Sequence, residues 1–276
     1  MGRAFTEPLV FGGHALHPAW DPPGFPTEDG LLSLLCAAHA GGIRTFDATY
    51  QAEVEVLGHL LRRWGPPPDV RVGCLQAYMV TRTPDAQRSQ LLRWLDLLGR
   101  PALDHLYVFP PPDPAQADEL RRQKAEGLFR SLGLWLRSPE EPFDPALFDF
   151  AAGVYNPAQP ELAGRFRELH ALGKDVLILA PMGSGGLLRA LPPSERGAAA
   201  GALLGHALSR PWRSAVSVTM RTRAEVGANV QAAREAFEGP VEPAVPSLFS
   251  PAGFRIWDSS RSALAPWDGK FGDAPA

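Results

Sequence analysis

Eight short apolar runs, separated by longer segments, restrict the fold of this chain more than any other feature. Most of the separating segments carry apolar residues at helical spacing, most clearly residues 30–39 and 161–172. Alternation of this kind is typical of parallel strands covered by helices. Eight such units in 276 residues predict a single α/β domain, a (β/α)8 TIM barrel. The expected strands are residues 9–12, 43–47, 70–76, 105–109, 132–136, 150–155, 176–180 and 214–218.

The fifth unit has little room for a covering helix. Pro139, Pro142 and Pro145 lie between the fifth and sixth predicted strands, and proline breaks a helix interior. We therefore expect a turn, or a single helical turn, in place of the fifth helix.

The end of the chain differs in composition from the rest. After Gly239 the sequence is rich in proline and serine, with isolated aromatic residues and no strand or helix periodicity. We expect residues 1–239 to form the barrel and residues 240–276 to form an extended tail that packs on it.

Charge and cysteine content narrow the class of partner. A net charge of −3 and a pI of about 6.2 give no basic field for nucleic acid, so a small-molecule ligand is expected. No apolar run approaches the roughly eighteen residues of a membrane span, and no apolar signal core is present. Cys36 and Cys74 have neither the number nor the spacing of a disulfide framework or a zinc site, so no metal is expected and the cytoplasm is the expected compartment.

Several sequence blocks, taken in order, resemble the aldo-keto reductase superfamily. The block GIRTFDATYQAEVEVLG (residues 42–58) is similar to the second strand and helix of that family, and LDHLYVFPPPD (103–113) to its fourth strand. VYNPAQPEL (154–162) is similar to the end of the sixth strand, and APMGSGGLL (180–188) to the turn after the seventh. Residues 217–233 are similar to the last strand, phosphate loop and helix.

The resemblance implies carbonyl reduction, in which a tyrosine donates a proton while NADPH delivers hydride, and a lysine and a histidine tune the tyrosine. Asp47 and Tyr50 occupy the places of the family's aspartate and tyrosine, although Tyr50 arrives about two residues early. A phenol with a pKa of about 10 needs such tuning to work at neutral pH. Gln76 takes the lysine's place, and the histidine's place falls at Phe109 or Pro110, so two of the four catalytic positions are lost.

The cofactor contacts implied by the resemblance are also incomplete. Trp135 and Leu136 replace a serine–asparagine pair that holds the nicotinamide, and Ala152 replaces a glutamine. The phosphate end is better preserved, with candidate contacts Gly183, Ser184, Gly185, Arg221 and Arg223. These five residues can also be read as a plain turn and two surface cations.

Three functions follow, in this order of preference. The first is a diverged enzyme without a cofactor that performs acid–base chemistry on a small molecule at the barrel mouth. Its candidate residues are Asp47, Tyr50, His14 and Gln76, and neutral Gln76 in place of a lysine should leave the pKa of Asp47 raised. The second is an NADP(H)-dependent carbonyl oxidoreductase with a modified tetrad. The third is a non-catalytic binding protein; the oligomeric state stays open.

Overall fold

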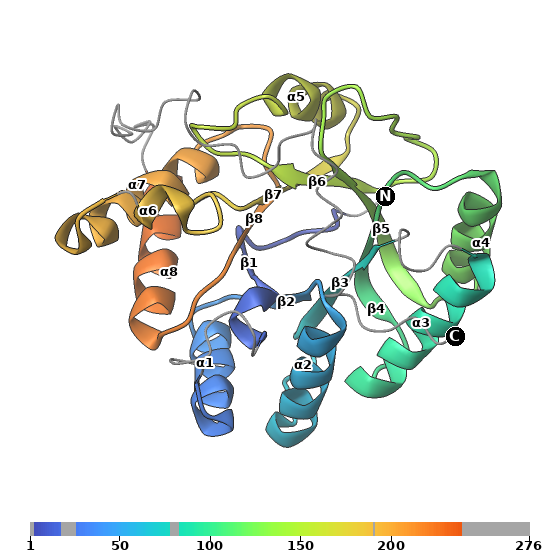
Figure 1. The fold of residues 1–276 in the computed structure, drawn as a ribbon, viewed down its shortest axis with the longest axis horizontal. Coiled ribbons are helices and arrows are strands. Elements are labelled where there is room, and N and C mark those ends of the chain that lie inside the picture. Colours follow the sequence, from blue (N-terminus) through green and yellow to red (C-terminus); the bar gives the residue numbers. More distant parts are fainter. Residues whose placement is uncertain (1–2, 18–25, 78–82, 190, 239–276) are drawn as a thin grey trace.

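The computed structural model describes residues 3–17, 26–77, 83–189 and 191–238, and in it eight parallel strands close into a barrel (Figure 1). Each strand pairs with the next in sequence, and β8 pairs with β1. The predicted barrel is confirmed. The strands are β1 (Leu9–Phe11), β2 (Thr45–Ala48), β3 (Arg71–Ala77), β4 (Leu103–Phe109), β5 (Phe129–Leu136), β6 (Phe150–Val154), β7 (Asp175–Leu179) and β8 (Ala215–Val218).

The helices form a layer outside the barrel (Figure 1). Sequence signals place their starts: Thr27 accepts a hydrogen bond from the Gly30 amide, and Thr83 followed by Pro84 opens the third long helix. The helices are η1 (Gly13–Leu16), α1 (Glu28–Ala40), α2 (Gln51–Trp64), α3 (Pro84–Leu98), α4 (Pro114–Ala125), α5 (Ala163–Ala171), α6 (Gly186–Arg189), η3 (Pro193–Glu195), α7 (Arg196–Leu208) and α8 (Arg223–Glu238). Among the described residues, every helix is too short or too polar to cross a lipid bilayer.

No helix lies between β5 and β6, where residues 137–149 are all described and form only turns and extended chain. This confirms the prediction made from the three prolines. The turns still cover the barrel wall, because Phe143, Leu147 and Phe148 are buried in the outer core.

Side chains alternate between two apolar layers. On β3, Val72 and Cys74 pack in the layer between barrel and helices, whereas Leu75 and Ala77 face the barrel interior. The interior is filled rather than hollow, in part because Gly133 leaves space for the ring of Phe150; a Cβ at Gly133 would lie 2.3 Å from that ring. Its apolar members are Phe5, Val10, Tyr50, Leu75, Ala77, Tyr107, Phe109, Trp135, Phe150, Ala152, Leu177 and Ala215.

The predicted tail, residues 240–276, lies outside the described residues, so its packing stays a prediction.

Candidate functional site

Asp47 lies on the inner face of β2, in the middle of the barrel wall. Its neighbour Phe46 packs in the outer layer, so Asp47 faces inward. Its Oδ2 accepts a hydrogen bond of 2.6 Å from the hydroxyl of Tyr107 on β4, and both side chains are buried. A carboxylate and a phenol from two strands therefore form one polar pair inside an apolar barrel.

The second oxygen of Asp47 has a different environment. Oδ1 is buried and has no hydrogen-bond partner among the described residues. It faces Gly73 on β3, where a Cβ would lie 3.1 Å from it. Burial raises the pKa of Asp47 to about 7 and the charge of Glu53 adds to this, while the Tyr107 bond and His14 oppose it. The direction agrees with the one expected from the sequence, and burial is its largest cause.

A second polar group lies beside the first. Glu53, in the first turn of α2, is fully buried and accepts hydrogen bonds from the backbone amides of Thr49 (2.7 Å) and Tyr50 (3.3 Å). It also bonds Nδ1 of His14, at 2.9 Å. His14 follows β1 in η1, and about 30% of its side chain is exposed. Glu53 thus joins the loops after β1 and β2 at the carboxyl end of the barrel, where active sites of such barrels lie.

Tyr50 belongs to this end of the barrel as predicted, but its role there includes packing. Its ring lies 5.5 Å from that of His14 and 5.3 Å from that of His17, and the residue is only 1% exposed. Burial, followed by the charge of Glu53, raises the pKa of Tyr50 above that of an ordinary phenol. Tyr50 is therefore a weaker acid here than a free tyrosine.

Gln76 does not join this group. Its amide nitrogen donates to the Gln87 carbonyl (2.8 Å) and to Gln90 Oε1 (3.1 Å), both on α3, so its side chain lies between the barrel wall and that helix. The assignment of Gln76 to the site is corrected accordingly. Side chains alternate along a strand, so a shift of one residue moves the lysine's place to the other face. The inward positions of β3 nearest the mouth are Leu75 and Ala77.

Tyr107 and Glu53 are the polar residues that sequence reasoning missed. Tyr107 lies in the predicted fourth strand, two residues from both His105 and Phe109. Because side chains alternate between the two faces of a strand, these three residues share one face, and this rule could have placed Tyr107 inside the barrel. Glu53 is three residues after Tyr50, at the third helical position, where an acidic residue caps a helix start. That signal indicates a cap, and nothing in the sequence indicates the bond to His14.

The residues aligned with the family's nicotinamide contacts are apolar or spatially separated. Trp135 and Ala152 face the interior, where Trp135 packs on Phe109 at 5.5 Å, while Leu136 faces the outer layer. The residues present therefore do not fit a nicotinamide amide group, which needs paired donors and acceptors.

The glycine turn after β7 uses its own backbone donors. The Gly183 amide bonds the Ala180 carbonyl (2.9 Å), and the Gly185 amide bonds the Met182 carbonyl (3.1 Å). Gly183, Ser184 and Gly185 all have left-handed backbones, with φ of 61°, 50° and 77°. The turn is thus closed by internal bonds, and two of the predicted phosphate donors are already engaged.

The start of α8 is occupied by a carboxylate of the chain itself. Glu225 accepts a 2.6 Å hydrogen bond from the Arg221 amide, and its own amide bonds Thr222 Oγ1 at 3.1 Å. Arg221 and Arg223 are both exposed at this point. Glu225 therefore satisfies a backbone donor that a phosphate would otherwise use.

Comparison with known proteins supports the fold. No family model and no curated protein matches the chain. A putative aldo-keto reductase from Pseudomonas aeruginosa has a TM-score of 0.69 at 18% identity, covering 84% of this chain and 90% of that one. For an aldo-keto reductase from Klebsiella pneumoniae in complex with NADPH the TM-score is 0.68 at 17% identity, covering 82% and 85%.

A further Klebsiella pneumoniae structure, an aldo/keto reductase in complex with NADP and acetate, has a TM-score of 0.70 at 16% identity, covering 91% of this chain and 94% of that one. The chain therefore has the (β/α)8 fold of the aldo-keto reductases, as the resemblance implies.

Proposed function

We propose that this protein is a diverged member of the aldo-keto reductase superfamily that performs acid–base chemistry on a small molecule, without hydride transfer. The observation that carries the proposal is the pair of Asp47 and Tyr107, joined at 2.6 Å inside the barrel. A carboxyl group whose pKa is about 7 both accepts and releases a proton at neutral pH.

The two oxygens of Asp47 have different parts in this chemistry. Oδ2 is held by the Tyr107 hydroxyl, whereas Oδ1 has no described partner and is the atom that would exchange the proton. Burial and the charge of Asp47 raise the pKa of Tyr107 well above its usual value. Tyr107 therefore stays protonated and positions the carboxylate.

The charge of the site selects its substrate. Asp47 and Glu53 are two buried carboxyl groups, and the charge of Glu53 acts on Asp47. An anionic substrate would be repelled when either carboxyl group is ionised. We expect a neutral or cationic small molecule.

Isotope exchange tests the proposal without knowledge of the product. The protein would be incubated in D2O with a panel of neutral carbonyl and hydroxyl compounds, and exchange at carbon followed by proton NMR. At least one compound should exchange with the wild type, and Asp47→Asn should reduce its rate by about 10²-fold or more, the usual size of such catalysis. The control Asp118→Asn, on the exposed face of α4, should exchange normally, and Tyr50→Phe reports whether the second phenol takes part. Full exchange by Asp47→Asn would remove this residue from the mechanism.

The second candidate is an NADP(H)-dependent carbonyl oxidoreductase. It is favoured by the two Klebsiella pneumoniae structures, whose chains were crystallised with NADPH or NADP. The interior positions of Leu75, Trp135 and Ala152 and the capping role of Glu225 oppose it.

Titration with NADPH, followed by its fluorescence and by the melting temperature, separates the two candidates. We expect no saturation up to about 100 μM, since a micromolar Kd needs roughly 8 kcal/mol of binding free energy. Micromolar or tighter binding would favour the reductase. If only the phosphate half binds, Arg221→Ala or Arg223→Ala should weaken it.

A further inference from the structure

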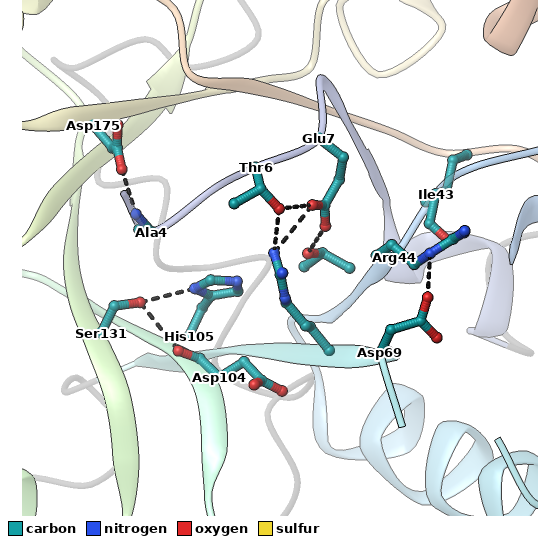
Figure 2. Close-up of polar contacts among 12 residues, drawn as sticks. Ala4, Thr6, Glu7, Ile43, Arg44, Asp69, Asp104, His105, Ser131 and Asp175 are labelled. Carbon is teal, nitrogen blue, oxygen red and sulfur yellow. Dashed lines mark hydrogen bonds and ion pairs between the residues drawn. The ribbon is translucent and has the colours of Figure 1, made fainter. Parts of the chain in front are cut away.

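A cavity of 490 Å³ lies at the amino end of the barrel, and one of its lining residues, His105, precedes Tyr107 by two residues on β4. It is formed where β3, β4, β5 and β7 begin, together with residues of the N-terminal segment. Figure 2 shows part of its lining: Ala4, Thr6, Asp104, His105, Ser131 and Asp175. Because these residues are drawn from separate strand starts, the cavity belongs to the closed barrel and not to one loop. Its volume is that of a small-ligand pocket.

The lining is richer in positive than in negative charge. Three carboxylates line the cavity, and each accepts a hydrogen bond from a backbone amide. Asp104 accepts from the amide of Val72, Asp149 from that of Leu132 and Asp175 from that of Ala4. These carboxylates are therefore fixed to the barrel rim. The five cations of the lining are Arg3, Arg71, Lys124, Arg130 and Lys174.

Not all of these cations are neutralised by the rim carboxylates. Lys124 pairs with Asp149 and Arg130 with Asp104, while Arg71 bonds Thr6 and Glu7. Within the described part of the chain, neither Arg3 nor Lys174 forms an ion pair with a carboxylate. Lys174 Nζ donates a hydrogen bond to the Pro145 carbonyl, at 2.6 Å. The cavity is thus suited to an anion.

His105 adds a second polar feature. It lines the cavity, is only 4% exposed and stacks on Phe5 at 4.6 Å. Its Nδ1 lies 2.8 Å from Ser131 Oγ, and Ser131 donates its proton to the Asp104 carbonyl at 3.1 Å (Figure 2). Because the Ser131 proton is used there, Nδ1 must be the donor to Ser131.

The other ring nitrogen of His105 is therefore a hydrogen-bond acceptor. Burial, with the charges of Arg71 and Arg130, lowers the pKa of His105 to about 3, so the ring is neutral at physiological pH. Nε2 then carries a lone pair, and it has no partner among the described residues. A buried acceptor without a donor is costly, so a ligand hydroxyl placed there would remove a penalty.

We infer that this cavity binds a small phosphate ester bearing a hydroxyl group, such as a sugar phosphate, with the cations on the phosphate and Nε2 of His105 accepting from the hydroxyl. A dianionic phosphate suits several separate cations better than a single carboxylate does. The inference does not rest on the proposed function, because neither the cations of the cavity nor His105 takes part in the acid–base chemistry proposed for Asp47.

Calorimetric titration of the full chain with glucose 6-phosphate, inorganic phosphate, gluconate and glucose tests the inference. Glucose 6-phosphate should bind at least tenfold more tightly than inorganic phosphate or gluconate, glucose should not bind detectably, and added salt should weaken binding. Tighter binding of gluconate would overturn the phosphate assignment, and absence of binding by every anion would overturn the site.

Matched variants locate the binding. Arg3→Gln and Arg130→Gln each remove an exposed cation of the lining. Each substitution should weaken the binding of glucose 6-phosphate at least fivefold. Arg93→Gln makes the same charge change on α3, outside the cavity, and should have no effect; an equal loss there would show nonspecific attraction and contradict the site.

His105→Phe tests the hydroxyl contact. It should leave inorganic phosphate binding unchanged while reducing the preference for glucose 6-phosphate to less than twofold. An unchanged preference in a folded His105→Phe variant would contradict the role of Nε2. If His105→Phe does not fold, the variants Arg3→Gln and Arg130→Gln still test whether the ligand binds in this cavity.

Discussion

At the scale of single residues, burial of Asp47 links its ionisation to the stability of the protein. Its folded-state pKa is raised from 3.8 to about 7. A group whose pKa is raised by folding contributes stability that is fully present below its unfolded pKa and is lost as pH rises through the folded one. For Asp47 this loss falls between about pH 4 and pH 7.

Asp47→Asn removes that dependence. The difference in the free energy of unfolding, variant minus wild type, should increase by on the order of 2 to 4 kcal/mol as the pH is raised from 4 to 8. Urea unfolding at several pH values measures the difference, and the pH-independent cost of burying an asparagine cancels from it. A difference that stays constant with pH would mean that Asp47 ionises equally in the folded and unfolded chains. Lower stability of the variant at neutral pH alone would instead indicate a structural ion pair.

At the scale of elements, strand and helix positions were predictable but the facing of single side chains was not. The missing helix after β5 followed from three prolines, and no predicted strand start differs from the observed one by more than three residues. Gln76 was placed on the wrong face because a family position was carried over without fixing the alternation of β3. Tyr107 was missed for the related reason that a tyrosine in an apolar run reads as core until its strand partners are known.

Helix packing gives a prediction at this scale. A Cβ on Gly58 of α2 would lie 2.2 Å from the Leu97 carbonyl oxygen, so Gly58→Ala should push α2 and α3 apart and cost about 1 to 3 kcal/mol. Gly201, in α7, has no heavy atom within 4 Å of the same position, so Gly201→Ala should stabilise by about 0.5 to 1 kcal/mol. Thermal unfolding of both variants checks the pair, and equal effects would contradict the close approach of α2 and α3.

At the scale of the whole molecule, closure of the barrel brings two polar sites close together, because Asp47 and His105 both lie beside Gly73 on β3. Glu53 and His14 lie on the carboxyl side of Asp47, and the cationic cavity lies at the amino end, next to His105. The period of the sequence predicted the barrel because strand and helix repeats are local properties. It could not predict the cavity, whose lining runs from Arg3 to Asp175 and meets only when the barrel closes.

The most direct test of the proposed acid–base site is the pKa of Asp47 in the folded protein. Carbon-13 NMR of aspartate-labelled protein, with Asp47→Asn to assign the signal, would follow its titration. We predict a midpoint of about 7 and a higher one in Tyr107→Phe, because the Tyr107 bond favours the ionised form. A midpoint near the 3.8 of an ordinary aspartate would leave Asp47 permanently ionised at neutral pH and contradict the account.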